Sequence, residues 1–492
     1  MKILMISAEA VPFAKTGGLA DAVSALAIAL KKEGHDVRIV MPRYYGIDKT
    51  KLTPLEGPMG IPGGYKEEWT AVYTAVMPGT KDLPVYLYFI DHEQAFGRDG
   101  VYGTAQESDF HDNPYRFSIL CQAAFQLCRK LSWIPDIMHA HDWSAALVPV
   151  LLRFNERSGD FSRTASVLTI HNLGYQGVYD KHQYPCLGLA WEHFYSSGFE
   201  FWDKINFLKA GLTSADILTT VSPTYAHEIQ SAEHGFQMEG LLQSRKDDLI
   251  GILNGVDTDV WNPASDTKIP VRYSAKTLAK KRENKAALQK AMGLRIDPAV
   301  PLVAMISRLA DQKGIGELFG PSYGCAYDMC SKMDMQFAVL GSGEQWCERE
   351  LLELQAKLPN FRCRIGYDDA LSHLIEAGAD FFLMPSRYEP CGLNQMYSLI
   401  YGTLPIVRRT GGLADTVQNY NEQTGEGTGF MFDWLSARSI FDTVGWAVYA
   451  WYNRKEHIEQ MKKRAMAQRF GWDESAKKYE QLYKKALAKV RL

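Results

Sequence analysis

Short apolar runs alternate with longer stretches of helical periodicity along the chain. Residues 2–8 read KILMISA, and a glycine-containing loop separates them from the helical pattern ADAVSALAIALKKEGH. This pattern breaks at Gly34, and the apolar run DVRIVMP follows directly. A strand, a helix and a strand at this spacing predict a βαβ unit, in which the parallel strands are buried on both faces.

The alternation predicts further strands in both halves of the chain. In the first half, DIMHAHD, SVLTIHN and ILTTVSP each have an apolar body and a polar end. The pattern restarts after Asn254 and Gly255 with PLVAMISRL, QFAVLGSG, RCRIGY, DFFLMPS and LPIVRRTGG. Ligands of open α/β sheets bind beyond the carboxyl ends of the strands, where such polar ends collect. We therefore expect two α/β domains with candidate binding groups at their strand ends.

The last residues predict a helix that no strand follows. The sequence WDESAKKYEQLYKKALAKV offers Asp473 as its N-cap. Because it has no strand to lead into, we expect it to pack back as a tail helix. Its packing face consists of Ala476, Tyr479, Leu482, Tyr483 and Ala486.

A basic stretch over residues 270–294 allows two interpretations. Its lysines resemble a nucleic-acid-binding patch, but Leu278, Ala286, Leu288 and Met292 also give it a packing face. The net charge of the whole chain is −3, which supplies no electrostatic basis for binding nucleic acid or an anionic membrane. We therefore interpret the lysines as a solvated helix surface.

Composition is that of an ordinary soluble globular protein, with 46% apolar and 23% charged residues. A length of 492 residues exceeds what one hydrophobic core usually serves and favours two domains. No segment approaches the roughly 20 apolar residues needed to span a bilayer. Glu9 interrupts the first apolar run, which we interpret as a buried strand and not as a signal peptide. The eight cysteines contain no Cys-x-x-Cys pair, which suits a reducing, cytoplasmic compartment.

Nearly the same nonapeptide occurs twice, as KTGGLADAV over residues 15–23 and RTGGLADTV over residues 409–417. The first copy follows a predicted strand and opens a helix, whose N-terminal N–H groups attract anions. Gly17 and Gly18 allow close backbone approach, and Lys15 adds a positive charge, so the loop suits a diphosphate. The loop lacks the G-x-G-x-x-G spacing of dinucleotide sites, and a plain turn is the alternative interpretation.

Two cations and a carboxylate stand at strand ends in the second half. Arg308 offers a planar fork and Lys313 a point charge, a pair suited to a pyrophosphate leaving group. Surface cations beside acidic partners are the alternative. Glu389 lies in a predicted turn, where it can accept hydrogen bonds from sugar hydroxyls while the following backbone amides face an anion. Cys391 is interpreted as a packing residue, because the sequence shows no base partner for a thiol nucleophile.

Histidines cluster near the strand ends of the first half. His139 and His141 share one face of a strand and, with Asp142, offer a possible metal site, but no fourth ligand stands out. Buried, hydrogen-bonded histidines are the alternative. His171, beside Asn172 and near two glycines, is more typical of a sugar contact. Six aromatic residues offer stacking surfaces for sugars, although core packing is the simpler interpretation: Trp191, Phe194, Tyr195, Phe199, Phe201 and Trp202.

Together these motifs resemble the bacterial glycogen synthase and plant starch synthase family, in family order over nearly the whole chain. The motifs that carry the resemblance include KTGGLADAV, HAHDW, TIHNLGYQG, GILNGVDTDVWNP, SRLADQKG, PSRYEPCGLNQMY and YGTLPIVRRTGGLADTV. The resemblance implies a GT-B fold of two Rossmann-like domains facing a deep cleft. It assigns the acceptor side to residues 1–251, the nucleotide-sugar side to 252–469, and a helix crossing back to the N-terminal domain to 470–492.

The family implies transfer of glucose from ADP-glucose to the non-reducing end of an α-1,4-glucan, with retention at the anomeric carbon. Carried over by motif, Arg308 and Lys313 neutralise the diphosphate, Glu389 holds the glucose, and Asp142 lies near the acceptor. His171 and Asn254 lie near the 6-hydroxyl, and Lys15 binds the nucleotide sugar. The further binding residues implied are Gly17, Gly18, Gln312, Tyr367, Cys391, Gly392, Leu393, Thr410 and Gly411. No cofactor or metal is expected, and front-face displacement assisted by the leaving phosphate is favoured because no nucleophile is evident.

Some alternatives and departures stay open at this level. The base is not named by the sequence, so UDP-glucose is an alternative donor; a phosphorylase-like enzyme and a noncatalytic glucan-binding scaffold are more distant alternatives. After Lys313, where the family has an amphipathic helix, GIGELFGPSYGCAYDM is glycine-rich and loses the apolar period, which puts the helix in doubt. The second nonapeptide receives only a positioning role, and we expect replacement of Gly17 to impair donor use more than replacement of Gly411.

Overall fold

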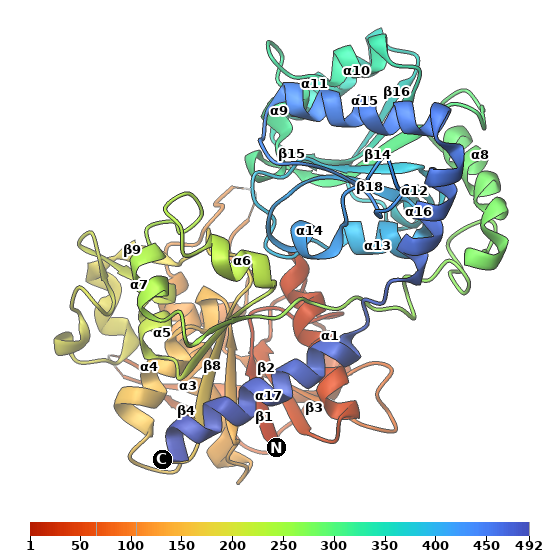
Figure 1. The fold of residues 1–492 in the computed structure, drawn as a ribbon. Coiled ribbons are helices and arrows are strands. Elements are labelled where there is room, and N and C mark those ends of the chain that lie inside the picture. Colours follow the sequence, from red (N-terminus) through yellow and green to blue (C-terminus); the bar gives the residue numbers. More distant parts are fainter. Residues whose placement is uncertain (65, 105, 492) are drawn as a thin grey trace. The chain divides into compact units, whose positions relative to one another are not determined.

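The computed structural model describes residues 1–64, 66–104 and 106–491 (Figure 1). The chain forms two compact units: Met1–Gly255 together with Trp472–Leu492 make up unit 1, and Val256–Gly471 make up unit 2. Each unit contains a sheet with parallel central strands and helices packed on it, so the expected α/β class is confirmed.

Unit 1 is built around one large sheet. Its strands are β1 (Lys2–Ile6), β2 (Asp36–Pro42), β3 (Thr53–Pro54), β4 (Met59–Pro62), β5 (Glu67–Val76), β6 (Tyr86–Asp91), β7 (Ile137–His141), β8 (Ala165–Ile170), β12 (Ile217–Thr220) and β13 (Leu249–Gly251). They lie in the order β13-β12-β8-β7-β1-β2-β6-β5-β3, with β4 paired to β5. The strands from β13 to β6 are parallel, and β5 joins β6 in antiparallel fashion. Ile3, Met5 and Ile6 of β1 are fully buried, as befits the centre of a sheet that is covered on both faces.

A small antiparallel sheet and several helices complete unit 1. The small sheet has the order β10-β11-β9 and consists of β9 (Val178–Asp180), β10 (Glu200–Phe201) and β11 (Lys204–Asn206). The α-helices are α1 (Gly18–Lys32), α2 (Glu93–Phe96), α3 (Asn113–Lys130), α4 (Leu147–Leu151), α5 (Phe207–Ser214), α6 (Pro223–Glu228), α7 (Glu239–Ser244) and α17 (Trp472–Arg491).

The C-terminal helix α17 belongs to unit 1 and packs against α1 and β8. The predicted face is confirmed, because its members are the buried residues Ala476, Tyr479, Leu482, Tyr483 and Ala486. The predicted N-cap is wrong: the helix begins at Trp472, so Asp473 lies in its first turn, where a carboxylate favours the helix dipole. The hydroxyl of Ser475 donates a 2.6 Å hydrogen bond to the carbonyl of Leu253, which links the first turn of the helix to the segment after β13.

Unit 2 contains a second parallel sheet. Its strands are β14 (Leu302–Leu309), β15 (Gln336–Gly343), β16 (Phe361–Ile365), β17 (Phe381–Met384), β18 (Leu404–Arg408) and β19 (Phe430–Phe432), in the order β16-β15-β14-β17-β18-β19. The α-helices are α8 (Lys281–Met292), α9 (Ile315–Phe319), α10 (Ala326–Lys332), α11 (Gln345–Lys357), α12 (Asp369–Gly378), α13 (Asn394–Tyr401), α14 (Gly411–Thr416), α15 (Ala437–Asn453) and α16 (Lys455–Ala467).

The basic helix α8 is less solvated than its sequence predicts. Lys281 is buried, and its ammonium donates to the carbonyls of Glu376 at 3.0 Å and Ala377 at 2.9 Å and to the hydroxyl of Thr403 at 2.7 Å. Burial lowers the pKa of Lys281 well below its ordinary value. Lys285 is also buried and pairs with Asp380 at 2.7 Å. The prediction of a wholly solvated surface is therefore wrong for these two lysines, which tie α8 to α12 and its neighbours.

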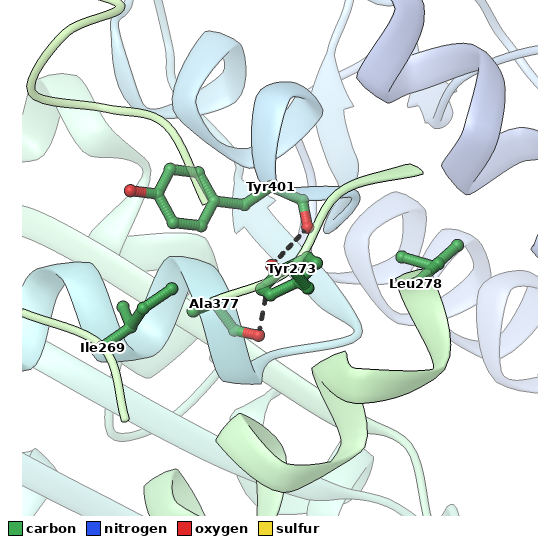
Figure 2. Close-up of a cluster of buried hydrophobic side chains, with 5 residues drawn as sticks. All are labelled: Ile269, Tyr273, Leu278, Ala377 and Tyr401. Carbon is green, nitrogen blue, oxygen red and sulfur yellow. Dashed lines mark hydrogen bonds between the residues drawn. The ribbon is translucent and has the colours of Figure 1, made fainter. Parts of the chain in front are cut away.

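Next to Lys281 lies a buried cluster that joins the start of unit 2 to its helices (Figure 2). Tyr273 donates a 2.7 Å hydrogen bond to the carbonyl of Tyr401, and its ring packs with Ile269 and Leu278. The tyrosine hydroxyl can be buried here because the carbonyl at the end of α13 satisfies it.

The glycine-rich segment after Lys313 forms two short helices in place of one amphipathic helix. Helix α9 ends at Phe319, and the chain turns before α10 begins at Ala326. A Cβ on Gly324 would lie 2.5 Å from the backbone nitrogen of Gly320, so the turn is too tight for a side chain there.

Candidate active site

In each unit the first strand of the parallel sheet, β1 or β14, lies inside the sheet, and later strands are added on both of its sides. In unit 1, strands β2 and β6 lie on one side of β1, and β7, β8 and β12 lie on the other. In unit 2, β15 and β16 lie on one side of β14, and β17, β18 and β19 lie on the other. Ligands of open α/β sheets bind at such switch points, at the carboxyl ends of the strands. The candidate site loops are therefore those after β1 and β7 in unit 1 and after β14 and β17 in unit 2.

The loop after β1 carries the first nonapeptide. Lys15 is half-exposed and pairs with Asp21 of α1, with 2.8 Å between Nζ and Oδ2. Gly17 is the N-cap of α1, and the helix begins at Gly18. A Cβ on Gly17 would meet nothing within 4 Å, so this side of the loop is open. The lysine and the helix start therefore lie together, as the motif predicts.

Buried Glu9 anchors this loop, a role that we did not predict from the sequence. Its carboxylate accepts hydrogen bonds from the backbone N–H and the hydroxyl of Thr16, the latter at 2.8 Å. It also accepts one from the hydroxyl of Tyr102 at 2.9 Å. The only signal for this role in the sequence was the carboxylate that interrupts the first apolar run, since Tyr102 is far away in the chain.

Asp142 and His171 meet at the ends of β7 and β8. Asp142 Oδ1 accepts the backbone N–H groups of His171 at 2.7 Å and Asn172 at 3.3 Å. Burial raises the pKa of the Asp142 carboxyl to about 7, although the two N–H bonds act in the opposite direction. The φ of Asp142 is +58°, a left-handed conformation that costs energy for a residue other than glycine. Such strain is typical of functional sites.

A row of histidines connects this site to the C-terminal helix. His171 Nε2 shares a 3.1 Å hydrogen bond with Nδ1 of His141, whose ring lies 4.0 Å from that of His139. His139 is bonded to the hydroxyls of Tyr483 at 2.9 Å and Thr169 at 2.6 Å. Burial lowers the pKa of both His139 and His171 to about 3. These histidines are therefore neutral at physiological pH and serve as hydrogen-bonding groups.

The metal interpretation of His139, His141 and Asp142 does not agree with this geometry. Over residues 1–64, 66–104 and 106–491, no group of three or more His, Cys, Asp or Glu side chains is arranged to hold a metal ion. Instead, His139 bonds to a tyrosine hydroxyl, His141 bonds to the ring of His171, and Asp142 accepts a backbone N–H group.

In unit 2, Lys313 and Glu389 form a pair between the ends of β14 and β17. Lys313 Nζ lies 2.6 Å from Glu389 Oε2, and the hydroxyl of Ser386 donates to the same oxygen at 2.8 Å. The two side chains of the pair are 18% and 8% exposed, so the ammonium is shielded from water on most sides. A partly buried ammonium of this kind interacts strongly with an additional anion, because water screens it little.

Arg308 and Gln312 lie beside this pair. Arg308 is near the end of β14, and its Nη2 donates to Gln312 Oε1 at 3.4 Å. Gln312 in turn donates to the carbonyl of Tyr388 at 3.2 Å, and its own carbonyl accepts the N–H of Arg387 at 2.8 Å. The predicted residues Arg308, Gln312, Lys313 and Glu389 are thus brought together by these contacts between the two loops.

The second nonapeptide supports the Glu389 loop through backbone packing. Gly411 has a φ of +44°, and a Cβ there would lie 1.9 Å from the carbonyl oxygen of Glu389. A Cβ on Gly412 would lie 2.0 Å from the carbonyl oxygen of Cys391. The N–H of Gly412 also donates to the carbonyl of Glu389 at 3.1 Å. Both glycines are required because the two backbones touch, in contrast to the open surroundings of Gly17.

The remaining predicted residues occupy more separate positions. Cys391 is buried, Gly392 has a φ of +68°, and Leu393 is the N-cap of α13. Thr410 is also buried and begins α14 as its N-cap. Outside this cluster, Asn254 is buried beyond β13 in unit 1, and Tyr367 follows β16 in unit 2 with a side chain that is 81% exposed.

Family models match both units. Residues 2–244 match the family described as starch synthase catalytic domain, and residues 292–467 match glycosyl transferases group 1. The glycogen synthase of Treponema denticola is 63% identical over 489 residues, covering 99% of each protein. Glycogen synthase 1 of Geobacter metallireducens is 46% identical over 497 residues, covering 99% of this chain and 97% of that protein.

One solved structure gives the same assignment, and a second supports the fold. The catalytic domain of starch synthase IV from Arabidopsis thaliana, bound to ADP and acarbose, has a TM-score of 0.89, with 32% identity and 99% of both chains covered. A sucrose-phosphate synthase from Thermosynechococcus elongatus has a TM-score of 0.58 at 18% identity and supports the fold alone. The fold is therefore GT-B, and the family resemblance noted from the motifs is confirmed. The chain belongs to the glycogen synthase and starch synthase family of hexosyltransferases.

Proposed function

We propose that this chain transfers glucose from ADP-glucose to the non-reducing end of an α-1,4-glucan, with retention at the anomeric carbon. The observation that carries the proposal is the contact of Lys313 with Glu389, with Arg308 held beside it. Two cations and a carboxylate at one switch point suit a nucleotide sugar, which has a diphosphate and a hydroxyl-rich ring. We assign the donor to unit 2 and the acceptor to unit 1.

In the proposed reaction, the bond between C1 of glucose and the diphosphate oxygen breaks, and the diphosphate keeps the electron pair. Arg308 and Lys313 neutralise the charge that grows on this oxygen, while Glu389 and the backbone after it hold the glucose. The acceptor hydroxyl oxygen bonds to C1 from the same face, and its proton passes to the departing phosphate oxygen. Because the cations act on charge that develops in the transition state, they raise turnover more than ground-state affinity.

Unit 1 contributes Lys15, Asp142 and His171 to this proposal. Lys15 binds the nucleotide sugar, after leaving its pairing with Asp21. His171 is neutral and half-buried, so it offers a hydrogen bond to a sugar hydroxyl without adding charge. The pKa of Asp142 lies near 7, so its carboxyl group can be protonated or ionised near neutral pH. It can therefore either donate a hydrogen bond to an acceptor hydroxyl or accept one from it.

ADP-glucose is favoured over UDP-glucose because the starch synthase IV structure contains ADP. The test measures nucleotide release from ADP-glucose and UDP-glucose side by side, with glycogen as acceptor. We expect faster release of ADP; faster release of UDP would assign the other donor, and no release from folded protein would favour a noncatalytic scaffold.

Lys313→Ala tests the role of the cation. Removing one such group is expected to lower kcat by about 10²–10³-fold, with a smaller change in KM for the donor. Lys332→Ala is the matched control, because Lys332 also pairs with a carboxylate in unit 2, that of Asp328 at 2.7 Å, but on the surface of α10. Equal kcat for wild type and folded Lys313→Ala would contradict the assignment.

We place the enzyme in the cytoplasm, in agreement with eight cysteines that include no Cys-x-x-Cys pair. No helix in the part of the chain that the structure describes is long and apolar enough to cross a membrane.

A further inference from the structure

The hairpin between β10 and β11 carries an exposed tryptophan in an unfavourable turn. Phe201 pairs with Lys204, so the loop has two residues, Trp202 and Asp203. Their φ angles are +52° and +62°, as in a type I′ turn, which strongly prefers asparagine and glycine. The Trp202 side chain is 77% exposed. Neither local conformation nor burial therefore explains a tryptophan here.

A second loop with the same unusual conformation holds this tryptophan. Phe236 and Gln237 have φ angles of +48° and +68°. Gln237 Oε1 accepts the indole N–H of Trp202 at 2.9 Å. Four residues in left-handed conformations thus lie in two loops that touch, and strain of this kind is concentrated at functional sites. The hydrogen bond fixes the edge of the indole and leaves its faces for stacking.

The two loops are joined to the segment that follows His171. Gln176 donates from its side chain to the carbonyl of Phe236 at 2.9 Å and accepts a 2.7 Å bond from buried Asn206 of β11. The neighbouring Tyr175 is 52% exposed, and its N–H donates to the carbonyl of Asn172 at 3.2 Å. Contacts within unit 1 therefore connect the platform, defined as Trp202 and its hydrogen-bond partner Gln237, to the loop of the candidate active site.

The chemistry of the platform favours a neutral, hydroxyl-rich ligand. Aromatic faces pack against the C–H faces of sugar rings, and the side chain of Gln237 adds hydrogen-bonding capacity at the rim. The carboxylate of Asp203, beside Trp202 in the turn, is paired with Lys181 at 2.6 Å, so it adds no uncompensated charge next to the indole. A protein partner is less suitable, because stable protein interfaces bury about 800 Å² on each side, far more than one indole ring and one amide supply.

We propose that Trp202, held by Gln237, forms an outer binding subsite for an α-1,4-glucan chain, away from its reacting end. This inference rests on the proposed function, which supplies the glucan. The platform contributes affinity for long acceptors and does not take part in the glucosyl transfer itself.

The test compares Trp202→Ala with wild type in native gels that contain glycogen, using the full chain. We expect the apparent Kd for glycogen to rise about five- to tenfold, as loss of one aromatic stack implies. Glucosyl transfer to maltotriose should keep the wild-type kcat. Trp69→Ala is the matched control, because Trp69 is a 59% exposed tryptophan on β5 of the same unit, and it should leave the Kd unchanged. An unchanged Kd for Trp202→Ala, or an equal loss for Trp69→Ala, would overturn the inference.

A second variant separates binding from folding. Trp202→Gly relieves the left-handed conformation, so its melting temperature should be equal to that of wild type or higher by about 1–3 °C, while glycogen affinity falls. Loss of both stability and affinity would show that Trp202 is structural and would overturn the inference. If wild type transfers no glucose to maltotriose, the proposed function fails, whereas the gel result still decides whether Trp202 binds glucan.

Discussion

Replacing Gly411 with alanine tests how the Glu389 loop is held. Gly411 has a φ of +44°, and the added Cβ would lie 1.9 Å from the carbonyl oxygen of Glu389. Real contacts of this kind are longer than 3.0 Å, so the Glu389 backbone has to move by about 1 Å. The left-handed conformation adds about 1–2 kcal/mol of strain for alanine.

The displacement is transmitted directly to the pair that carries the proposed chemistry. Glu389 Oε2 lies 2.6 Å from Lys313 Nζ and 2.8 Å from the hydroxyl of Ser386, so a backbone shift of this size breaks or lengthens both contacts. A misplacement of about 1 Å in an active site lowers the rate by about 10²-fold. We therefore expect Gly411→Ala to lose about that factor in kcat and some thermal stability of unit 2.

The assay is steady-state nucleotide release with ADP-glucose and glycogen, together with thermal unfolding of each variant. Gly17→Ala is the matched control from the first nonapeptide, because its φ is −157° and its Cβ would meet nothing within 4 Å. It should lose less of its kcat than Gly411→Ala does, because no protein atom has to move to make room for the Cβ. This order reverses the one expected from the sequence, where Gly17 ranked above Gly411. A folded Gly411→Ala enzyme with wild-type kcat, or a larger loss for Gly17→Ala, would refute the reasoning.

Two further predictions concern the histidines of unit 1. Tyr483→Phe removes the hydroxyl that lies 2.9 Å from His139 Nδ1, and the unsatisfied buried nitrogen should lower the free energy of unfolding by about 1–3 kcal/mol in thermal or urea unfolding. An unchanged stability would show that this bond contributes nothing. The pKa of His171 is lowered to about 3, so between pH 6.5 and pH 3 the unfolded chain takes up a proton that the folded chain does not. Acid therefore destabilises wild type through His171, by about 2 kcal/mol between pH 7 and pH 5, and His171→Asn should be less acid-sensitive by that amount. Parallel pH profiles of the free energy of unfolding for wild type and His171→Asn would contradict the prediction.

The sequence predicts most of the strands and places the candidate residues at their ends, because both depend on local patterns. Apolar runs with polar ends become β7, β8, β14, β17 and β18, and the candidate residues lie where these strands end. The buried face of α17 was also predicted, since its period of apolar residues is regular over the whole helix.

Features that depend on distant partners were not predicted. Lys281 looks like a solvated lysine in the sequence, and only the carbonyls near the end of α12 and the hydroxyl of Thr403 explain its burial. Likewise, Glu9 acquires its role through Tyr102, and the need for glycine at Gly411 comes from the backbone of Glu389. No local periodicity records these contacts, which form only when the units fold.

The central claim is glucosyl transfer from ADP-glucose to a glucan. Its most direct test incubates the full chain with radiolabelled ADP-glucose and glycogen and measures both the ADP released and the glucose incorporated. We predict equal amounts of the two, with the new residues in α-1,4 linkage. ADP release without incorporation, or no release from folded protein, would contradict the account.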